Sequence, residues 1–137
     1  MSEPIWKKQG QGQGPNEAVM RFLAGEDVLL DRQLIEFDIR ASQAHVRGLG
    51  MIGLLSDAEV DKLLTGLDTI AVDLAAGELQ LDARFEDCHS ALEAWLTERL
   101  GPVGGKVHTG RSRNDQVAVA LRLYMKDRLS QLQTVCL

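Results

Sequence analysis

Apolar residues recur at three- and four-residue steps in several separate segments, and this spacing constrains the fold more than any other feature. Such spacing places the apolar side chains on one face of a helix. No segment of useful length alternates apolar and polar residues, as a half-buried strand would. We therefore predict an all-α protein, a bundle of helices joined by short loops. The first long segment carries Leu30, Leu34, Phe37, Ala41, Ala44 and Gly48.

Cap residues mark the ends of the predicted helices in the first half of the chain. Asn16 is a candidate N-cap for a short helix that stops around Gly25. The first long helix is expected to begin at Leu30 and to end between Gly48 and Gly53. Ser56 and Glu59 form a capping-box pattern for the next helix, and Gly77 suits its C-terminal cap.

Two more helices are predicted in the second half. One runs roughly from Glu86 to Leu100 and is ended by Gly101-Pro102. Its predicted inward positions are Cys88, Leu92, Trp95, Leu96 and Leu100. Four glycines and a proline make residues 101–110 the least helical part of the folded region. A last long helix is expected still to be running at Leu137, and its apolar positions are Val117, Leu121, Met125, Leu129 and Leu132.

Charge is distributed unevenly along the chain. The net charge is −5, and counting Asp, Glu, Lys and Arg gives −1 for residues 1–55, −8 for residues 56–100 and +4 for residues 101–137. An acidic chain disfavours nucleic acid and anionic membranes as partners, whereas the basic C-terminal third can still hold a small anion. No apolar run approaches the roughly 20 residues of a membrane span, so we expect a cytoplasmic protein. The two cysteines have no metal-binding or redox spacing.

The richest polar segment lies between Lys106 and Asp115, directly before the last helix. It holds two arginines, a histidine, hydroxyl groups and an amide. Guanidinium groups bind planar carboxylates, and the free N–H groups at a helix start favour a negative ligand. The segment therefore predicts a carboxylate-binding loop. The alternative is that Ser112 and Asp115 only cap the helix while the arginines face solvent.

Two other clusters are weaker candidates. Glu86 and His89 are close enough to face one site, but carboxylates in a first helical turn are also explained by the helix dipole, and a metal would need further ligands. Asp38, Ser42 and His45 have the residue types of a hydrolase triad, yet no strand–turn elbow presents the serine. We therefore expect no nucleophilic catalysis from them.

Several motifs, taken in order, resemble the N-terminal third of argininosuccinate lyases, members of the fumarase/aspartase superfamily. The resemblance covers nearly the whole chain from about Ile5. It implies an N-terminal helical domain followed by a long central helical bundle that assembles into a homotetramer. The motifs are Ile5-Trp6-Lys7, Leu30-Asp31, Phe37-Asp38-Ile39, Ser42-Gln43-Ala44-His45, Glu86-Asp87-Cys88-His89 and, most specific, His108-Thr109-Gly110-Arg111-Ser112-Arg113-Asn114-Asp115-Gln116-Val117.

The resemblance also implies a reaction, the reversible elimination of argininosuccinate to L-arginine and fumarate in arginine biosynthesis, with neither metal nor organic cofactor. A base removes a proton beside a carboxylate, and the developing charge must be stabilised. By position, Asp27 stands where some members have a substrate-contacting serine, and His89 resembles a histidine that lines the active site. The other substrate-binding residues implied are Thr109, Ser112, Arg113 and Asn114.

The family's catalytic histidine and mobile serine loop belong to later motifs, so this chain is expected to hold no catalytic residue and to be inactive alone. The implied division is a flexible tail at residues 1–15, a helical lyase domain at residues 16–112 and the start of a truncated central-bundle helix at residues 113–137. Two alternatives remain. One is a sister lyase such as adenylosuccinate lyase, and the other is a non-catalytic helical remnant or structural module.

Overall fold

A computed structural model describes residues 27–82 and 84–136. Within these ranges every regular element is helical and there is no strand, which confirms the predicted all-α class. The helix predicted at residues 16–25 and the flexible tail at residues 1–15 lie outside the described residues, as does Leu137. The elements are α2 (Asp27–Asp31), α3 (Ile35–Met51), α4 (Asp57–Ala76), α5 (Cys88–Leu100), the 3-10 helix η1 (Gly101–His108) and α6 (Arg113–Cys136).

The predicted helix starting at Leu30 is two helices, so that expectation was wrong at its N-terminal end. A turn separates α2 from α3, with the backbone N–H of Leu34 bonded to the carbonyl of Asp31 at 2.9 Å. Leu30 is 59% exposed and does not join the buried face. Asp31 instead accepts a hydrogen bond from the backbone N–H of Cys88 at 2.9 Å, which attaches α2 to the start of α5.

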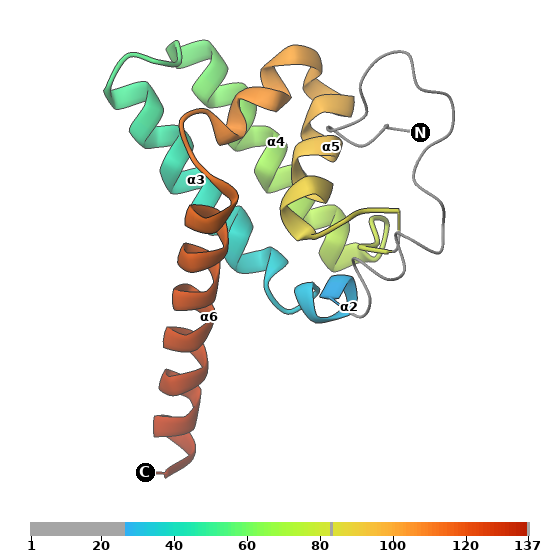
Figure 1. The fold of residues 1–137 in the computed structure, drawn as a ribbon, viewed down its shortest axis with the longest axis vertical. Helices are drawn as coiled ribbons and strands as arrows, with labels where there is room; N and C mark the ends of the chain where they lie inside the picture. Colours follow the sequence, from blue (N-terminus) through green and yellow to red (C-terminus); the bar gives the residue numbers. More distant parts are fainter. Residues whose placement is uncertain (1–26, 83, 137) are drawn as a thin grey trace.

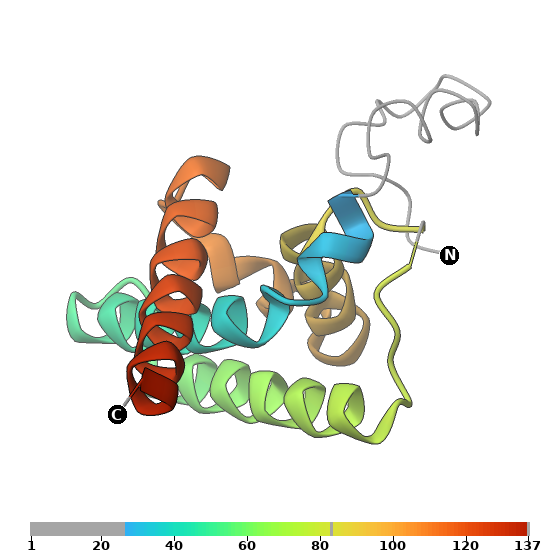
Figure 2. The same ribbon diagram turned by 90° about the horizontal axis from the view of Figure 1, so that it is seen from below.

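Helix α4 begins and ends where its cap residues predict. The Glu59 carboxylate accepts a hydrogen bond from the Ser56 backbone N–H at 3.0 Å, and Gly77 takes the left-handed conformation with φ 77°. Figure 2 shows α4 along one side of the bundle, with α3 and α5 packed on it and α6 against α3.

The core lies where α3, α4 and α5 meet. Helix α5 begins at Cys88 rather than Glu86, because Asp87 is its N-cap and accepts a hydrogen bond from the Ser90 backbone N–H at 2.7 Å. Its predicted inward positions are confirmed, with Leu100 only partly buried. The buried apolar side chains of these helices include Val46, Leu49, Leu63, Leu67, Ile70, Cys88, Leu92, Trp95 and Leu96.

The glycine-rich stretch at residues 101–110 is more ordered than its composition predicts. Gly101–His108 forms a 3-10 helix that packs closely on α5 and buries Val107. Gly104 explains the close approach, because a Cβ at this position would lie 2.4 Å from the backbone carbonyl of Leu96. The absence of a side chain at Gly104 thus allows η1 to pack on α5 and does not indicate a flexible loop.

Helix α6 leaves the bundle and projects beyond the other helices (Figure 1). Only Gln116 and Ala120 are buried on it, where it crosses α3. The predicted apolar face is exposed over its length: Val117, Leu121, Met125, Leu129 and Leu132 are between 41% and 61% exposed. None of the helices in the described ranges combines the length and apolar character needed to cross a membrane.

Gly104→Ala should destabilise the chain, because the new methyl group would overlap the backbone of α5. Overpacking of this kind costs about 1–3 kcal/mol. Gly105→Ala is the matched control, since its Cβ would meet only the Thr97 hydroxyl at 4.0 Å. Urea unfolding of the two variants measures the difference, and equal stabilities would contradict the packing of η1.

Candidate functional site

The loop between η1 and α6 begins the last helix with a reciprocal cap. Gly110 has φ 69°, a conformation that side chains disfavour, and it turns the chain toward Ser112. The Asp115 carboxylate accepts hydrogen bonds from the Ser112 backbone N–H and hydroxyl, both at 2.9 Å. These bonds hold the pKa of Asp115 below its usual value. The capping interpretation of Ser112 is therefore confirmed.

Two helices anchor the start of the loop. His45 Nε2 on α3 lies 2.9 Å from the Thr109 carbonyl oxygen, and the Thr109 hydroxyl donates to the carbonyl of Lys106 at 2.8 Å. The Lys106 ammonium pairs with Glu59 on α4 and, by hydrogen bonding, lowers the pKa of that carboxyl to about 2. The loop therefore has a fixed place on the bundle.

Arg113 and Asn114 are the first two residues of α6, at the open side of the loop. The Arg113 side chain is 39% exposed and lies 3.2 Å from Asp87, the N-cap of α5. It also donates to the Gln116 side-chain oxygen at 3.2 Å. Asn114 is exposed. A half-exposed guanidinium next to free helix N–H groups can bind an incoming carboxylate.

Beneath this open side lies a buried polar cluster that joins the loop to α3 and α5. Asp38 and Ser42 are fully buried on α3. Arg111 Nη2 donates to the Ser42 hydroxyl at 2.9 Å and to His108 Nδ1 at 3.2 Å. Asp38 Oδ2 lies 2.8 Å from His89 Nδ1 on α5, although the N–H direction is poorly aligned for a hydrogen bond.

Burial controls the charges in this cluster. Desolvation, helped by the nearby Arg111 charge, lowers the pKa of His108 to about 4, so this imidazole is neutral at pH 7. Desolvation also lowers the pKa of Arg111, while Asp38 opposes that change. Burial, followed by the Asp38 charge, raises the pKa of the Cys88 thiol. The cluster thus holds the buried Asp38 carboxyl group beside His89, with the Arg111 charge acting on it.

Asp38, Cys88 and His89 also bring three potential metal-ligand atoms within 4.8 Å of one another. Their chemistry fits a cation poorly. Arg111 already provides positive charge beside Asp38, and the buried thiol strongly resists the deprotonation that ligation requires. The three atoms are better explained as part of the polar cluster.

The structure distributes the other predicted site residues as follows. His89 is buried, 2% exposed, and lies two residues after the Asp87 partner of Arg113. Asp27 is the first residue of α2, and its side chain lies outside what the structure describes. The Asp38, Ser42 and His45 side chains contact His89, Arg111 and Thr109 rather than one another, in line with the rejected triad.

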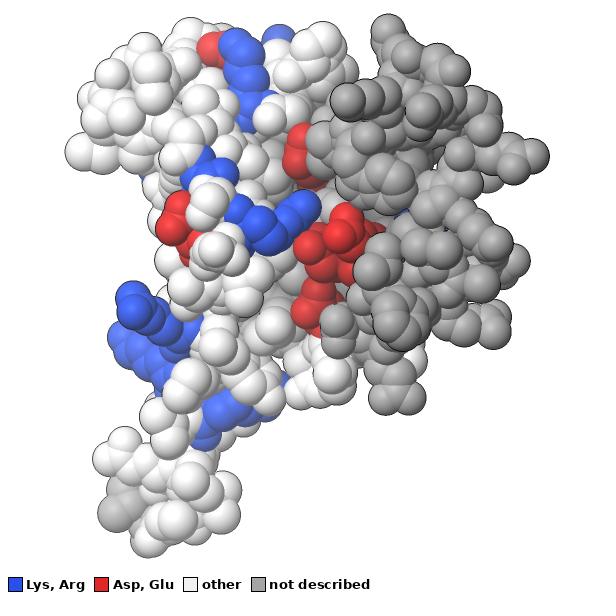
Figure 3. Space-filling view, viewed as in Figure 1, with Lys and Arg blue, Asp and Glu red and all other residues white. Residues whose placement is uncertain are grey.

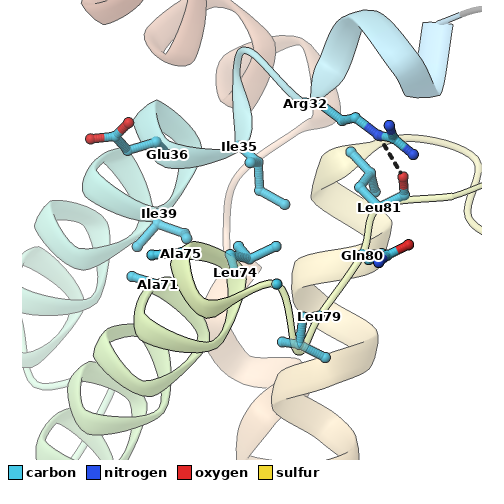
Figure 4. A pocket seen from close by; sticks show the side chains of 11 residues that line it. Arg32, Ile35, Glu36, Ile39, Ala71, Leu74, Ala75, Leu79, Gln80 and Leu81 are labelled. Carbon is cyan, nitrogen blue, oxygen red and sulfur yellow. Dashed lines mark hydrogen bonds between the residues drawn. The ribbon is translucent and has the colours of Figure 1, made fainter.

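A separate pocket of about 680 Å³ lies at the other end of α3, between its first turns and the end of α4 (Figure 4). Its floor is apolar, with Ile35, Ile39 and Leu74 among the lining side chains. Arg32 stands at its rim, where Nε donates to the Leu81 carbonyl at 2.9 Å. None of the predicted substrate-binding residues whose side chains the structure describes lines this pocket.

The sequence that forms this helical bundle and loop matches a protein-family model described as lyase, over residues 11–136. The chain therefore belongs to the lyase family. Its sequence is 50% identical over 135 residues to the argininosuccinate lyase of Xanthomonas euvesicatoria pv. vesicatoria, covering 98% of this chain and 31% of that protein. The argininosuccinate lyase of Xanthomonas campestris pv. campestris (strain B100) is 51% identical over 132 residues, 96% of this chain and 30% of that relative.

The argininosuccinate lyase of Xylella fastidiosa is 49% identical over 135 residues, 98% of this chain and 30% of the relative. The chain thus spans about a third of the length of the curated relatives it matches. These identities confirm the resemblance seen in the sequence motifs.

Sequence reasoning missed the buried cluster as a unit. Asp38 and Ser42 were recognised as members of a rejected triad and of the family motifs, and Arg111 as a loop cation in such a motif, but not as parts of one cluster. The available signal was Asp38, a polar residue at a position that the helical spacing assigns to the buried side. A buried carboxylate requires a partner, so this position predicts a polar cluster. The identity of that partner depends on how three segments pack.

The unfolding free energy should decrease as the pH falls from 6.5 to about 4 because of His108. In this window the unfolded chain binds a proton on this imidazole that the folded chain does not. The free energy of unfolding therefore falls by at most about 1.4 kcal/mol for each pH unit. His108→Gln keeps a group that can accept from Arg111 but removes the titration. Urea unfolding across this range should give a flatter curve for the variant, and parallel curves would contradict the assignment.

Proposed function

We propose that this chain is the N-terminal part of an argininosuccinate lyase and supplies one wall of an active site that eliminates fumarate from argininosuccinate. The geometry of the loop supports the proposal most directly. Its backbone is fixed by bonds to α3 and α4, while Arg113 and Asn114 stand at its open side. A carboxylate seated there would meet a guanidinium, an amide and the start of α6.

In this proposal Arg113 and Asn114 contact the substrate, Thr109 and Ser112 shape the loop, and His89 approaches from α5. Asp87 holds the Arg113 guanidinium in the absence of substrate, at 3.2 Å. An incoming carboxylate could compete for the same N–H groups. The contribution of Asp27, at the start of α2, is part of the proposal by sequence position alone.

The chain would provide binding rather than proton transfer. The proton-transfer groups would come from other segments of a complete enzyme, in a cytoplasmic homotetramer built around the central bundle. The face of α6 supports such an assembly, because a helix with a continuous exposed apolar row needs a partner surface. Figure 3 shows basic side chains along the middle of α6 and uncharged ones toward its C-terminal end.

The proposal can be tested with a chimera. This chain replaces the N-terminal 31% of the Xanthomonas euvesicatoria relative, and fumarate release from argininosuccinate is followed by ultraviolet absorbance. The chimera should release fumarate, whereas the 137-residue chain alone should not. Arg113→Ala should lower kcat/KM roughly 10- to 150-fold, as expected for loss of a hydrogen bond to a charged group.

Lys106→Ala is the matched control, since this lysine pairs with Glu59 on α4 and should affect kcat/KM far less. Equal losses in the two variants would contradict the roles given to them. A folded tetrameric chimera that consumes adenylosuccinate and leaves argininosuccinate untouched would instead favour the sister lyase. A folded chimera without either activity would favour a structural module.

The apolar face of α6 should make the 137-residue chain self-associate. Adding charge at Leu121 and Met125, which are 44% and 51% exposed, should shift the chain toward monomer because it removes the apolar row. The test variant is Leu121→Glu with Met125→Glu. The control is Ser130→Glu with Thr134→Glu, which adds the same charge on a different side of the helix. Sedimentation velocity over a concentration series reads the result, and a monodisperse monomer in the unmodified chain would count against the proposed assembly.

A further inference from the structure

Asp38 is a fully buried carboxylate at the centre of groups from three elements. It shares α3 with Ser42, faces His89 of α5 and attracts the Arg111 guanidinium of the loop. Neither oxygen has a well-aligned hydrogen bond among the described residues. A buried charge is costly unless opposite charge or polar hydrogens compensate it.

The contact with His89 restricts where the imidazole can carry its proton. Asp38 Oδ2 lies 2.8 Å from His89 Nδ1, and both side chains are nearly free of solvent. A carboxylate oxygen and a bare ring nitrogen at this distance would set two lone pairs against each other. A proton on Nδ1 removes this repulsion, so an ionised Asp38 favours the ring form that carries Nδ1–H even without a well-aligned hydrogen bond.

We propose that Asp38 is a positioning residue that favours the His89 tautomer with its proton on Nδ1 and a bare Nε2, which can accept a hydrogen bond from an N–H group of the substrate. The proposal rests on the proposed function for its substrate and goes beyond it in assigning Asp38 a role. Asp38 acts through His89 and does not itself contact the ligand. The charge of Asp38 also acts on the Arg111 guanidinium, which the Ser42 hydroxyl and His108 Nδ1 hold in the same cluster.

Hydrogen bonds elsewhere in the cluster fit this arrangement. Arg111 Nη2 donates to His108 Nδ1, so neutral His108 carries its proton on Nε2. The two buried histidines are thereby assigned opposite tautomers by their different neighbours, a carboxylate for His89 and a guanidinium for His108. This contrast gives the experiment an internal reference.

The test is 15N NMR of the ring nitrogens in the 137-residue chain, which has only three histidines. His89 should carry its proton on Nδ1 with a bare Nε2, and His108 should show the reverse. Asp38→Asn should raise the population of the His89 Nε2–H tautomer, because the amide can donate to Nδ1. Asp31→Asn is the control, since Asp31 bonds the Cys88 backbone and not the ring, and it should leave the His89 tautomer unchanged.

A bare Nδ1 or a protonated Nε2 on His89 in the unmodified chain overturns the proposal. An unchanged tautomer in folded Asp38→Asn also overturns it. If circular dichroism shows that Asp38→Asn does not fold, the tautomer of the unmodified chain decides alone. The NMR measurement does not depend on enzyme activity. A negative NMR result would therefore overturn the role of Asp38 without bearing on the proposed lyase function. In an active chimera, Asp38→Asn should also reduce kcat/KM and shift its pH profile, whereas an unchanged profile would contradict the role.

Discussion

The buried charge of Asp38 is the constraint on which the rest of the site depends. It lies on α3, its printed contact is with His89 on α5, and its charge also acts on Arg111 in the loop before α6. Burying a carboxylate is unfavourable unless opposite charge and polar hydrogens surround it. The segments that supply them must therefore meet at one place, and this requirement fixes the loop over the bundle as firmly as the apolar core fixes the helices.

The two interpretations of the loop are compatible in this arrangement. Ser112 and Asp115 cap α6, which satisfies backbone donors at the helix start. Arg111 turns inward to the cluster, whereas Arg113 remains half-exposed beside Asp87. The two arginines, separated by one residue, thus differ: Arg111 anchors the loop, and Arg113 stays partly exposed, where we propose that it meets the ligand. Capping rigidifies the loop without using the groups that would bind a carboxylate.

Helical spacing and cap residues predicted the class, the limits of α4 and the buried face of α5, because these features depend on local sequence. The break between α2 and α3 was missed; it comes directly after Asp31, which bonds to Cys88, 57 positions away, a contact that local sequence does not reveal. The 3-10 helix at Gly101–His108 was also missed, because the sequence alone does not distinguish a glycine needed for close packing from a glycine in a flexible loop. For the site, the motif indicated the residues at the open side, but not the pairing of Asp38 with His89, which exists only after the bundle forms.

The central claim is that Asp38 and Arg111 lie in one buried polar cluster, where their opposite charges stabilise each other without a direct ion pair. A double-mutant cycle with Asp38→Asn and Arg111→Gln, measured by urea unfolding of the 137-residue chain, tests it most directly. Mutual stabilisation predicts a coupling free energy of about 0.5–3 kcal/mol, the range for residues in one polar network. Single-variant effects that add within about 0.3–0.5 kcal/mol, as they do for independent sites, would contradict the account.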